Sequence, residues 1–308
     1  MLVALILLVL GFVLLVKGAD YFVDGASSLA ARMRIPPIII GLTVVAMGTS
    51  APEAAVSISS ALHGSNAIAI GNVLGSNIVN VLFILGFTAM ITPLVVQKNT
   101  VRYEIPFVGL ITILLYWLGL QYGMISRAGA GLFLGLFVVF LGYLYFMSRN
   151  TECSIDQIKT LSTTKIVLYS VLGLMALVWG SNLTVESAVS IARYIGISER
   201  VIGLTIVALG TSLPELVTSV IAARKGESDI AIGNIVGSNI FNILFVLGIA
   251  GLILPIPFNS AFLFDGIVAI LTTVMLWVFV MPHKRLTFIP GMLFMVAYLA
   301  YVLYLICG

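Results

Sequence analysis

The chain has 308 residues, of which 61% are hydrophobic and only 9% are charged, and its formal net charge is +3. Soluble domains carry about 25% charged residues, so this composition excludes a soluble globular protein. The chain has no GxxxxGK[ST] motif and its basic residues are scattered, which argues against an ATP-driven pump formed by this chain alone and against a nucleic-acid partner.

Ten apolar segments follow one another along the chain, each long enough to cross a bilayer as a helix. We therefore expect an all-α polytopic membrane protein, because backbone polar groups in lipid must be satisfied within the segment. The first segment lacks the basic n-region of a signal peptide and is interpreted as a span. The expected spans are 2–32, 36–62, 67–93, 103–121, 128–147, 164–194, 198–223, 229–254, 261–281 and 286–306.

The first and sixth spans are too long to cross a membrane upright. At a rise of ~1.5 Å per residue, about 31 residues reach ~46 Å, against ~30 Å of hydrocarbon. They are expected to tilt or protrude, and their small residues should let them slide along neighbouring helices. Asp20 and Asp24 of the first span are interpreted as interfacial or water-facing groups rather than ligands, because Asn182 and Glu186 stand at the matching places of the sixth.

The chain contains an internal repeat at a constant offset of 162. Residues 40–86 and 202–248 align without a gap, and 28 of the 47 positions are identical. Each half then holds five spans, and an odd number of crossings predicts an inverted-topology repeat. The expected units are a first five-helix repeat at 1–148, a cytoplasmic linker at 149–163 and a second five-helix repeat at 164–308.

Lysine and arginine predict the orientation. If the N-terminus is outside, eleven of them fall on inner loops and only Arg127, Arg193 and Arg200 on outer loops. This bias predicts that both termini lie outside, and the expected location is the plasma membrane. Cys153 and Cys307 are then expected on opposite sides, which excludes a disulfide between them.

Each copy of the repeat carries one acid directly after a proline in an apolar stretch, Glu53 after Pro52 and Glu215 after Pro214. An acid within a membrane costs at least ~2.5 kcal/mol and is a functional candidate by default. Proline removes a helical hydrogen bond, so the turn before each acid is expected to loosen and to offer free carbonyl oxygens at the membrane midplane.

Oxygen-bearing residues surround each predicted acid. Ala46, Thr49, Ser50 and Ser57 share one helical face with Glu53, and residues 208–215 repeat this pattern. The next span adds a stripe at every fourth residue: Asn72, Ser76 and Asn80 in the first copy, and Asn234, Ser238 and Asn242 in the second.

These carboxylate, amide, hydroxyl and carbonyl oxygens suit Na⁺ or Ca²⁺, not zinc or copper. Two ionised glutamates are neutralised by one Ca²⁺ or by two Na⁺. An occupied site is then neutral and an empty site is charged, which favours exchange of one ion for the other over leak. Small polar residues also pack membrane helices, and for Asn77 the packing and ligand interpretations stay equally open.

The motifs GTSAPE (48–53) with GNVLGSNIVN (71–80), and GTSLPE (210–215) with GNIVGSNIFN (233–242), closely resemble the two α-repeats of the sodium/calcium exchanger family, within the calcium/cation antiporter superfamily. The resemblance implies four ion sites in a diamond at the membrane centre. It implies that Glu53 and Glu215 hold Ca²⁺, helped by the carbonyls of Thr49 and Thr211, and that sliding of the first and sixth spans switches access.

The same resemblance implies the sodium ligands and the middle position. Asn80 and Asn242 would line the middle position; many family members have an aspartate where this chain has Asn242, so one possible carboxylate is absent here. Sodium would use Ala46, Thr49, Ser50 and Ser76 in the first half, and Ala208, Thr211, Ser212 and Ser238 in the second.

The first hypothesis is an electrogenic Na⁺/Ca²⁺ antiporter that needs no cofactor, transports Ca²⁺ and Na⁺, lies in membrane lipid and is sufficient as a monomer. A close alternative is H⁺/Ca²⁺ exchange, because paired glutamates could carry protons. A channel fits the oxygen-lined helices, but no loop has the features of a carbonyl-ring filter. An intramembrane hydrolase would need an activated nucleophile or a metal-bound water, and no HExxH motif or Ser/His pairing is present.

Overall fold

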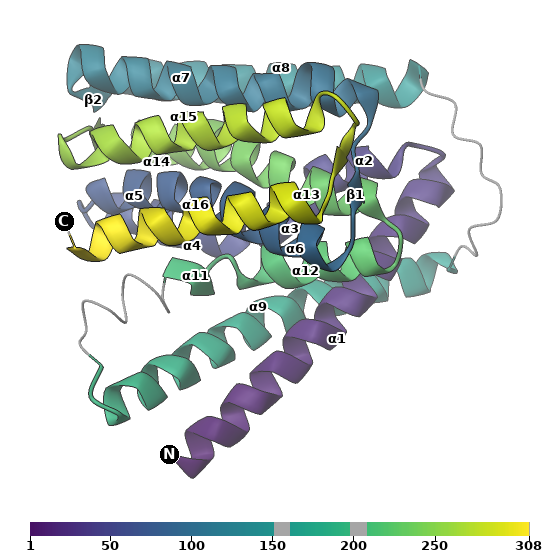
Figure 1. Cartoon of the computed structure of the whole chain (residues 1–308). Helices are drawn as coiled ribbons and strands as arrows, with labels where there is room; N and C mark the ends of the chain where they lie inside the picture. Colours follow the sequence, from purple (N-terminus) through teal and green to yellow (C-terminus); the bar gives the residue numbers. More distant parts are fainter. Residues whose placement is uncertain (151–160, 198–207, 308) are drawn as a thin grey trace.

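The computed structural model describes residues 1–150, 161–197 and 208–307, and this part of the chain is mainly helical (Figure 1). The seventh predicted span is therefore described only from Ala208 onward, and Cys153, Lys159 and Arg200 lie outside the described residues. Cys307 is exposed at the end of the last helix.

Eight helical segments of the described chain are long and apolar enough to cross a membrane, and one bent pair would add a ninth. Their ends agree with the predicted spans to within a few residues. The eight are Leu2–Met33, Ala67–Ile91, Thr100–Tyr122, Arg127–Asn150, Thr163–Tyr194, Ser228–Ile253, Ala261–Val280 and Phe288–Cys307, and the bent pair is Pro37–Thr49 with Ala51–Leu62.

Several of these segments contain more than one helical element, because short π-helical stretches (η) interrupt them. The first half contains α1 (Leu2–Met33), α2 (Pro37–Ile40), η1 (Gly41–Val45), α3 (Ala46–Thr49), α4 (Ala51–Leu62), α5 (Ala67–Ile78), η2 (Val79–Leu85), α6 (Gly86–Ile91), η3 (Thr100–Glu104), α7 (Ile105–Tyr122) and α8 (Arg127–Asn150). The second contains α9 (Thr163–Tyr194), α11 (Ala208–Gly210), α12 (Leu213–Arg224), α13 (Ser228–Phe241), η5 (Asn242–Val246), α14 (Leu247–Ile253), α15 (Ala261–Val280) and α16 (Phe288–Cys307).

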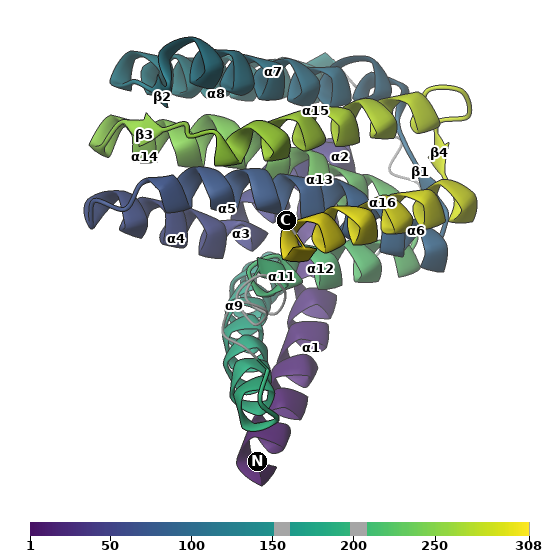
Figure 2. The same ribbon diagram turned by 60° about the vertical axis from the view of Figure 1, so that its left-hand side comes forward.

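The expectation of an entirely helical chain missed four two-residue strands in the connecting loops. β1 (Leu94–Val95) pairs with β4 (Arg285–Leu286), and β2 (Met124–Ile125) pairs with β3 (Ile256–Pro257), both antiparallel. The two pairs lie at opposite ends of the helical bundle (Figure 2). Each pair joins a loop of the first half to a loop of the second, where backbone groups outside lipid can form ladder hydrogen bonds.

α1 and α9 pack side by side and project away from the other helices, as Figures 1 and 2 both show. Each has 32 residues, as expected for the two longest spans. Glycines let their backbones touch: a Cβ on Gly18 would lie 2.7 Å from the backbone nitrogen of Leu177 and 2.8 Å from the carbonyl oxygen of Gly173. The same contact recurs at Gly180, whose Cβ would lie 2.7 Å from the nitrogen of Leu15.

α1 is also tied to the loop between α12 and α13. The Lys225 ammonium lies 2.7 Å from Asp20 Oδ1 and 2.6 Å from Asp24 Oδ1, and Ser27 Oγ donates a 2.6 Å hydrogen bond to Glu227 Oε1. The Asp20 and Asp24 side chains are 39% and 46% exposed, in keeping with water-facing groups. Burial lowers the pKa of Lys225, but the hydrogen bonds to both aspartates outweigh it and raise the pKa overall, so the ammonium stays charged at neutral pH.

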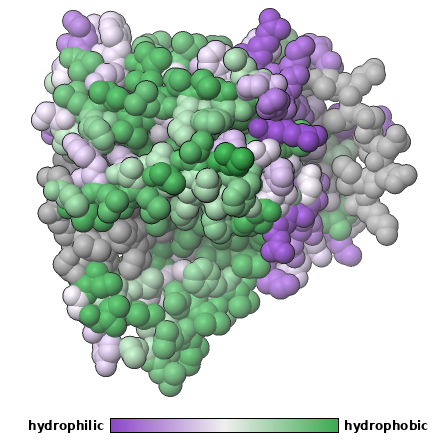
Figure 3. Space-filling model, in the orientation of Figure 1, coloured by the Kyte–Doolittle hydropathy of each residue, from purple (hydrophilic) through white to green (hydrophobic). Residues whose placement is uncertain are grey.

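The outer surface is apolar along the helix flanks. Side chains such as Leu110, Val138 and Phe146 are about two-thirds exposed, which would be costly in water and is favourable in lipid. Hydrophilic residues gather at the end of the molecule where β1 and β4 lie (Figure 3). This distribution is that of a membrane protein whose core helices are enclosed by lipid-facing ones.

Candidate ion-binding site

Glu53 and Glu215 lie in the first turns of two matching 12-residue helices, α4 and α12. Both glutamates are only 1% exposed. The positive end of the helix dipole favours negative charge at this place. In the first half, α4 begins after a break at Ser50, and the two arms of the broken span are bent by 51°. Pro52 therefore lies in the first turn of a new helix that begins at Ala51. The sequence had suggested instead that it loosens a turn of one continuous helix.

Each acid is held by a serine from the other half of the chain. Ser50 Oγ donates a hydrogen bond of 2.7 Å to Glu215 Oε1, and Ser212 Oγ donates one of 3.2 Å to Glu53 Oε1. Both serines are buried and are the N-cap residues of α4 and α12. The first turns of α4 and α12 thus meet at a single centre that contains both predicted acids.

The neighbouring helices brace the turns that carry the acids. Asn72 Nδ2 donates to the Glu53 carbonyl at 3.2 Å and to Ser57 Oγ at 3.0 Å. At the matching place Asn234 Nδ2 donates to the Glu215 carbonyl at 3.3 Å and to Ser219 Oγ at 3.0 Å. Their amide groups therefore hold the α4 and α12 backbones in place.

Two further predicted ligands, one from each half of the chain, lie at the Ala46 carbonyl. Thr49 Oγ1 lies 3.3 Å from that carbonyl oxygen and 2.9 Å from Asn234 Oδ1, and Ser238 Oγ donates to the same carbonyl at 3.4 Å. Thr49 is fully buried and Ser76 almost so. In the second half, Ala208 begins α11, and Thr211 lies half-buried in the turn between α11 and α12.

Backbone irregularities that the sequence analysis did not predict lie beside the site. The π-helical stretch η2 begins at Val79 and η5 begins at Asn242, so both predicted middle-position asparagines lie in widened helical turns. π-helical turns often occur at functional sites. Nothing in the local hydrophobic pattern distinguishes them from ordinary α-helix.

Four buried oxygen atoms of the site accept no hydrogen bond from the described residues: Glu53 Oε2, Glu215 Oε2, Asn80 Oδ1 and Asn242 Oδ1. A buried acceptor without a partner costs free energy, of the order of 1–3 kcal/mol for a neutral group. Hard cations are the natural partners for such oxygens, because Na⁺ and Ca²⁺ take carboxylate and amide ligands. The described chain holds no cluster of three or more His, Cys, Asp and Glu side chains, and the candidate centre combines two acids with neutral oxygens.

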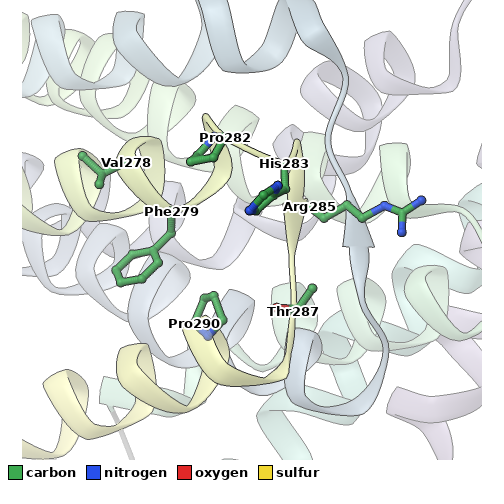
Figure 4. Close-up of a pocket in the computed structure, with 7 residues that line it drawn as sticks. All are labelled: Val278, Phe279, Pro282, His283, Arg285, Thr287 and Pro290. Carbon is green, nitrogen blue, oxygen red and sulfur yellow. The ribbon is translucent and has the colours of Figure 1, made fainter.

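A large surface pocket of about 820 Å³ lies elsewhere, between the facing ends of α15 and α16 (Figure 4). Its lining includes Val278, Phe279, Pro282 and His283, and no acid. The Arg285 side chain points away from Phe279 and Pro290. The two histidines of the chain, His63 and His283, are both exposed. Without carboxylates this pocket is no candidate for a cation site.

Comparison with known proteins gives consistent matches along the chain. The family model described as sodium/calcium exchanger protein matches residues 3–146 and 165–307. Inner membrane protein YrbG of Escherichia coli (strain K12) is 40% identical over 265 residues, covering 83% of this chain and 81% of that protein. Sodium/calcium exchanger MaX1 of Methanosarcina acetivorans is 33% identical over 342 residues, covering 97% of each. A solved structure of the sodium-calcium exchanger NCX_Mj, soaked with 2.5 mM Na⁺ and 0.1 mM Ca²⁺, matches with a TM-score of 0.85 at 30% identity over 98% of both chains.

Proposed function

The chain belongs to the sodium/calcium exchanger family, and from this premise we propose that it exchanges Na⁺ for Ca²⁺ by alternating access at a site built around Glu53 and Glu215. As a member of that family it is a membrane transporter of inorganic cations and not an enzyme. The observation that supports the site assignment is the set of four buried oxygens, two from each half, that have no hydrogen-bond partner in the described part of the chain.

The charge of the site supports exchange. Two ionised glutamates give a charge of −2, which one Ca²⁺ or two Na⁺ neutralise, whereas an empty site would leave two buried carboxylates repelling each other. The change between the outward-facing and inward-facing states is therefore favoured when the site holds cations over when it is empty. The proposed ligands are Ala46, Thr49, Ser50, Glu53, Ser76 and Asn80, with Ala208, Thr211, Ser212, Glu215, Ser238 and Asn242.

We propose ten spans in two inverted five-helix repeats, at 1–148 and 164–308, joined by the linker 149–163. Hydrogen bonds related by the offset of 162 support the repeat, because the bond from Ser50 to Glu215 has its counterpart from Ser212 to Glu53. The tenth span in this count is the seventh along the chain, predicted at 198–223, of which the structure describes only the part from Ala208 onward. The distribution of lysine and arginine supports an orientation with both termini outside, and we place the protein in the plasma membrane.

Alternating access would require α1 and α9 to move past the other helices. The glycine contacts between them support movement as one unit, because backbones in direct contact cannot separate without losing packing. Such movement would break the contacts of Asp20 and Asp24 with Lys225. This ion pair would therefore stabilise one of the two states.

Replacing Lys225 with glutamine is expected to change the turnover rate by a few-fold and to leave Ca²⁺ affinity nearly unchanged. Partly exposed ion pairs contribute about 0–1 kcal/mol, which corresponds to no more than about fivefold in the balance of states. Initial uptake rates over a range of Ca²⁺ concentrations test this. Lys98→Gln is the control, because Lys98 is an exposed lysine with no ion pair among the described residues. A large loss of Ca²⁺ affinity in Lys225→Gln alone would contradict the assignment.

The central experiment is radioactive Ca²⁺ uptake into proteoliposomes preloaded with Na⁺, compared with sodium-free vesicles and with vesicles whose gradient has been collapsed. Uptake that requires outward-directed Na⁺ is the expected result. Uptake driven by a proton gradient alone would show that the coupling ion is H⁺ and not Na⁺. Absence of uptake under either gradient, in protein that is folded by its thermal melting curve, would refute Ca²⁺ exchange.

A further inference from the structure

Four asparagines meet where the segment from α5 to η2 crosses the segment from α13 to η5. Asn77 and Asn80 come from the first segment, and Asn239 and Asn242 from the second. All four are at most 5% exposed. Buried amides must pair their donors and acceptors, so their hydrogen bonds determine which end of each amide faces which neighbour.

The bonds cross between the halves. Asn80 Nδ2 donates to Asn239 Oδ1 at 3.0 Å, and Asn242 Nδ2 donates to Asn77 Oδ1 at 3.2 Å. Asn77 and Asn239, the outer asparagines, also bind each other's backbone. Asn77 Nδ2 donates to the Asn239 carbonyl at 3.2 Å, and Asn239 Nδ2 donates to the Asn77 carbonyl at 3.4 Å. Each outer asparagine thus uses both ends of its amide.

Asn80 and Asn242, the inner asparagines, form hydrogen bonds with only one end of the amide. Asn80 Oδ1 and Asn242 Oδ1 are buried and have no hydrogen-bond partner among the described residues. An amide offers an oxygen at one end and an NH₂ group at the other. Only the oxygen attracts a cation, and an NH₂ group in its place would repel one.

We propose that Asn77 and Asn239 are positioning residues that anchor the NH₂ groups of Asn242 and Asn80, so that the free amide oxygens are presented to the bound cation. This inference rests on the proposed ion exchange. If the anchor is lost, the NH₂ group has no fixed acceptor and the amide can turn over. The amide then presents its NH₂ group, which repels the cation, in place of the oxygen that attracts it.

The atoms used in the hydrogen bonds distinguish this positioning role from simple helix packing. Packing uses the Nδ2 atoms of Asn77 and Asn239, whereas positioning uses their Oδ1 atoms. Positioning also predicts a crossed dependence, in which Asn77 acts only through Asn242 and Asn239 acts only through Asn80. A residue that merely supports the fold would show no such preference.

A double-mutant cycle on the full-length protein in detergent tests the proposal, with Ca²⁺ affinity read from the rise in melting temperature on adding Ca²⁺. Asn77→Ala and Asn242→Ala are each expected to weaken Ca²⁺ binding about tenfold, the loss of roughly one buried hydrogen bond or ligand. The Asn77→Ala/Asn242→Ala double variant should bind no more weakly than Asn242→Ala. Asn77→Ala combined with Asn80→Ala should instead show additive losses.

Asn66→Ala is the matched structural control. Asn66 is a buried asparagine whose Nδ2 bonds the carbonyls of Ala250 and Leu254, and it belongs to no predicted ion site. It should lower the melting temperature without changing the response to Ca²⁺. Additive effects of Asn77→Ala and Asn242→Ala, or an Asn77→Ala variant that behaves like Asn66→Ala, would overturn the positioning role. A wild-type protein that binds no Ca²⁺ would overturn the proposed function and this inference together.

Discussion

Replacing Glu53 with glutamine is expected to abolish Na⁺-driven Ca²⁺ uptake while the protein stays folded. Glutamine has nearly the same shape and keeps an oxygen that can accept the hydrogen bond from Ser212. It removes one of the two negative charges that neutralise Ca²⁺. At about 4 Å and an effective dielectric constant near 20, two unit charges interact by about 4 kcal/mol, so losing a carboxylate beside a divalent ion should cost at least roughly a thousandfold in affinity.

The same loss is expected for Glu215→Gln, because that carboxylate has an equivalent bond from Ser50. Uptake into proteoliposomes measures transport, and a melting curve verifies folding. Glu104→Gln is the control: Glu104 is an equally buried acid of a predicted span, but its partner is Tyr143 and it contacts none of the site residues in the hydrogen bonds described. Normal uptake by Glu53→Gln or Glu215→Gln would show that the site assignment is wrong.

Replacing Gly18 with leucine is expected to have the second largest effect, by forcing α1 away from α9. Even the first carbon of the new side chain would lie 2.7–2.8 Å from backbone atoms of Leu177 and Gly173, which cannot rotate aside. Overpacking of this kind usually costs 1–3 kcal/mol, and more where backbone must shift. We expect a lowered melting temperature and strongly reduced uptake.

Gly135→Leu provides the matched comparison for that substitution. Gly135 is an exposed glycine of α8, and a Cβ placed there meets no atom of the described residues within 4 Å. It should melt close to wild type, because replacing glycine in a helix usually favours the helix. If both leucine variants melt and transport alike, the close α1–α9 contact is not required for function.

Hydropathy and the internal repeat predicted most of the fold. They placed the described helices, and the two 32-residue ones among them, because length and apolarity are local properties of the chain. The four short strands were missed, since each pairs loops about 130 to 190 residues apart. Two residues per strand leave no periodic signal.

The sequence named the residues of the candidate site but did not predict their geometry. The buried acids, Ser50 and Ser212 were named, and the structure brings them together. The sequence left Asn77 open between packing and ligand, because its meaning depends on Asn242, 165 residues away. The π-helical turns at Val79 and Asn242 were not foreseen, because hydrophobic periodicity does not distinguish i→i+5 from i→i+4 bonding.

The crossed serine–glutamate bonds have a consequence for how the chain is made. Ribosomal synthesis proceeds from the N-terminus, so Glu53 enters the membrane about 160 residues before its partner Ser212 has been translated. Until then the first half holds an acid in lipid with its hydroxyl partner missing. During biogenesis that carboxyl group must remain hydrated or keep its proton, and the nascent first half cannot reach its final packing until the second half is inserted beside it.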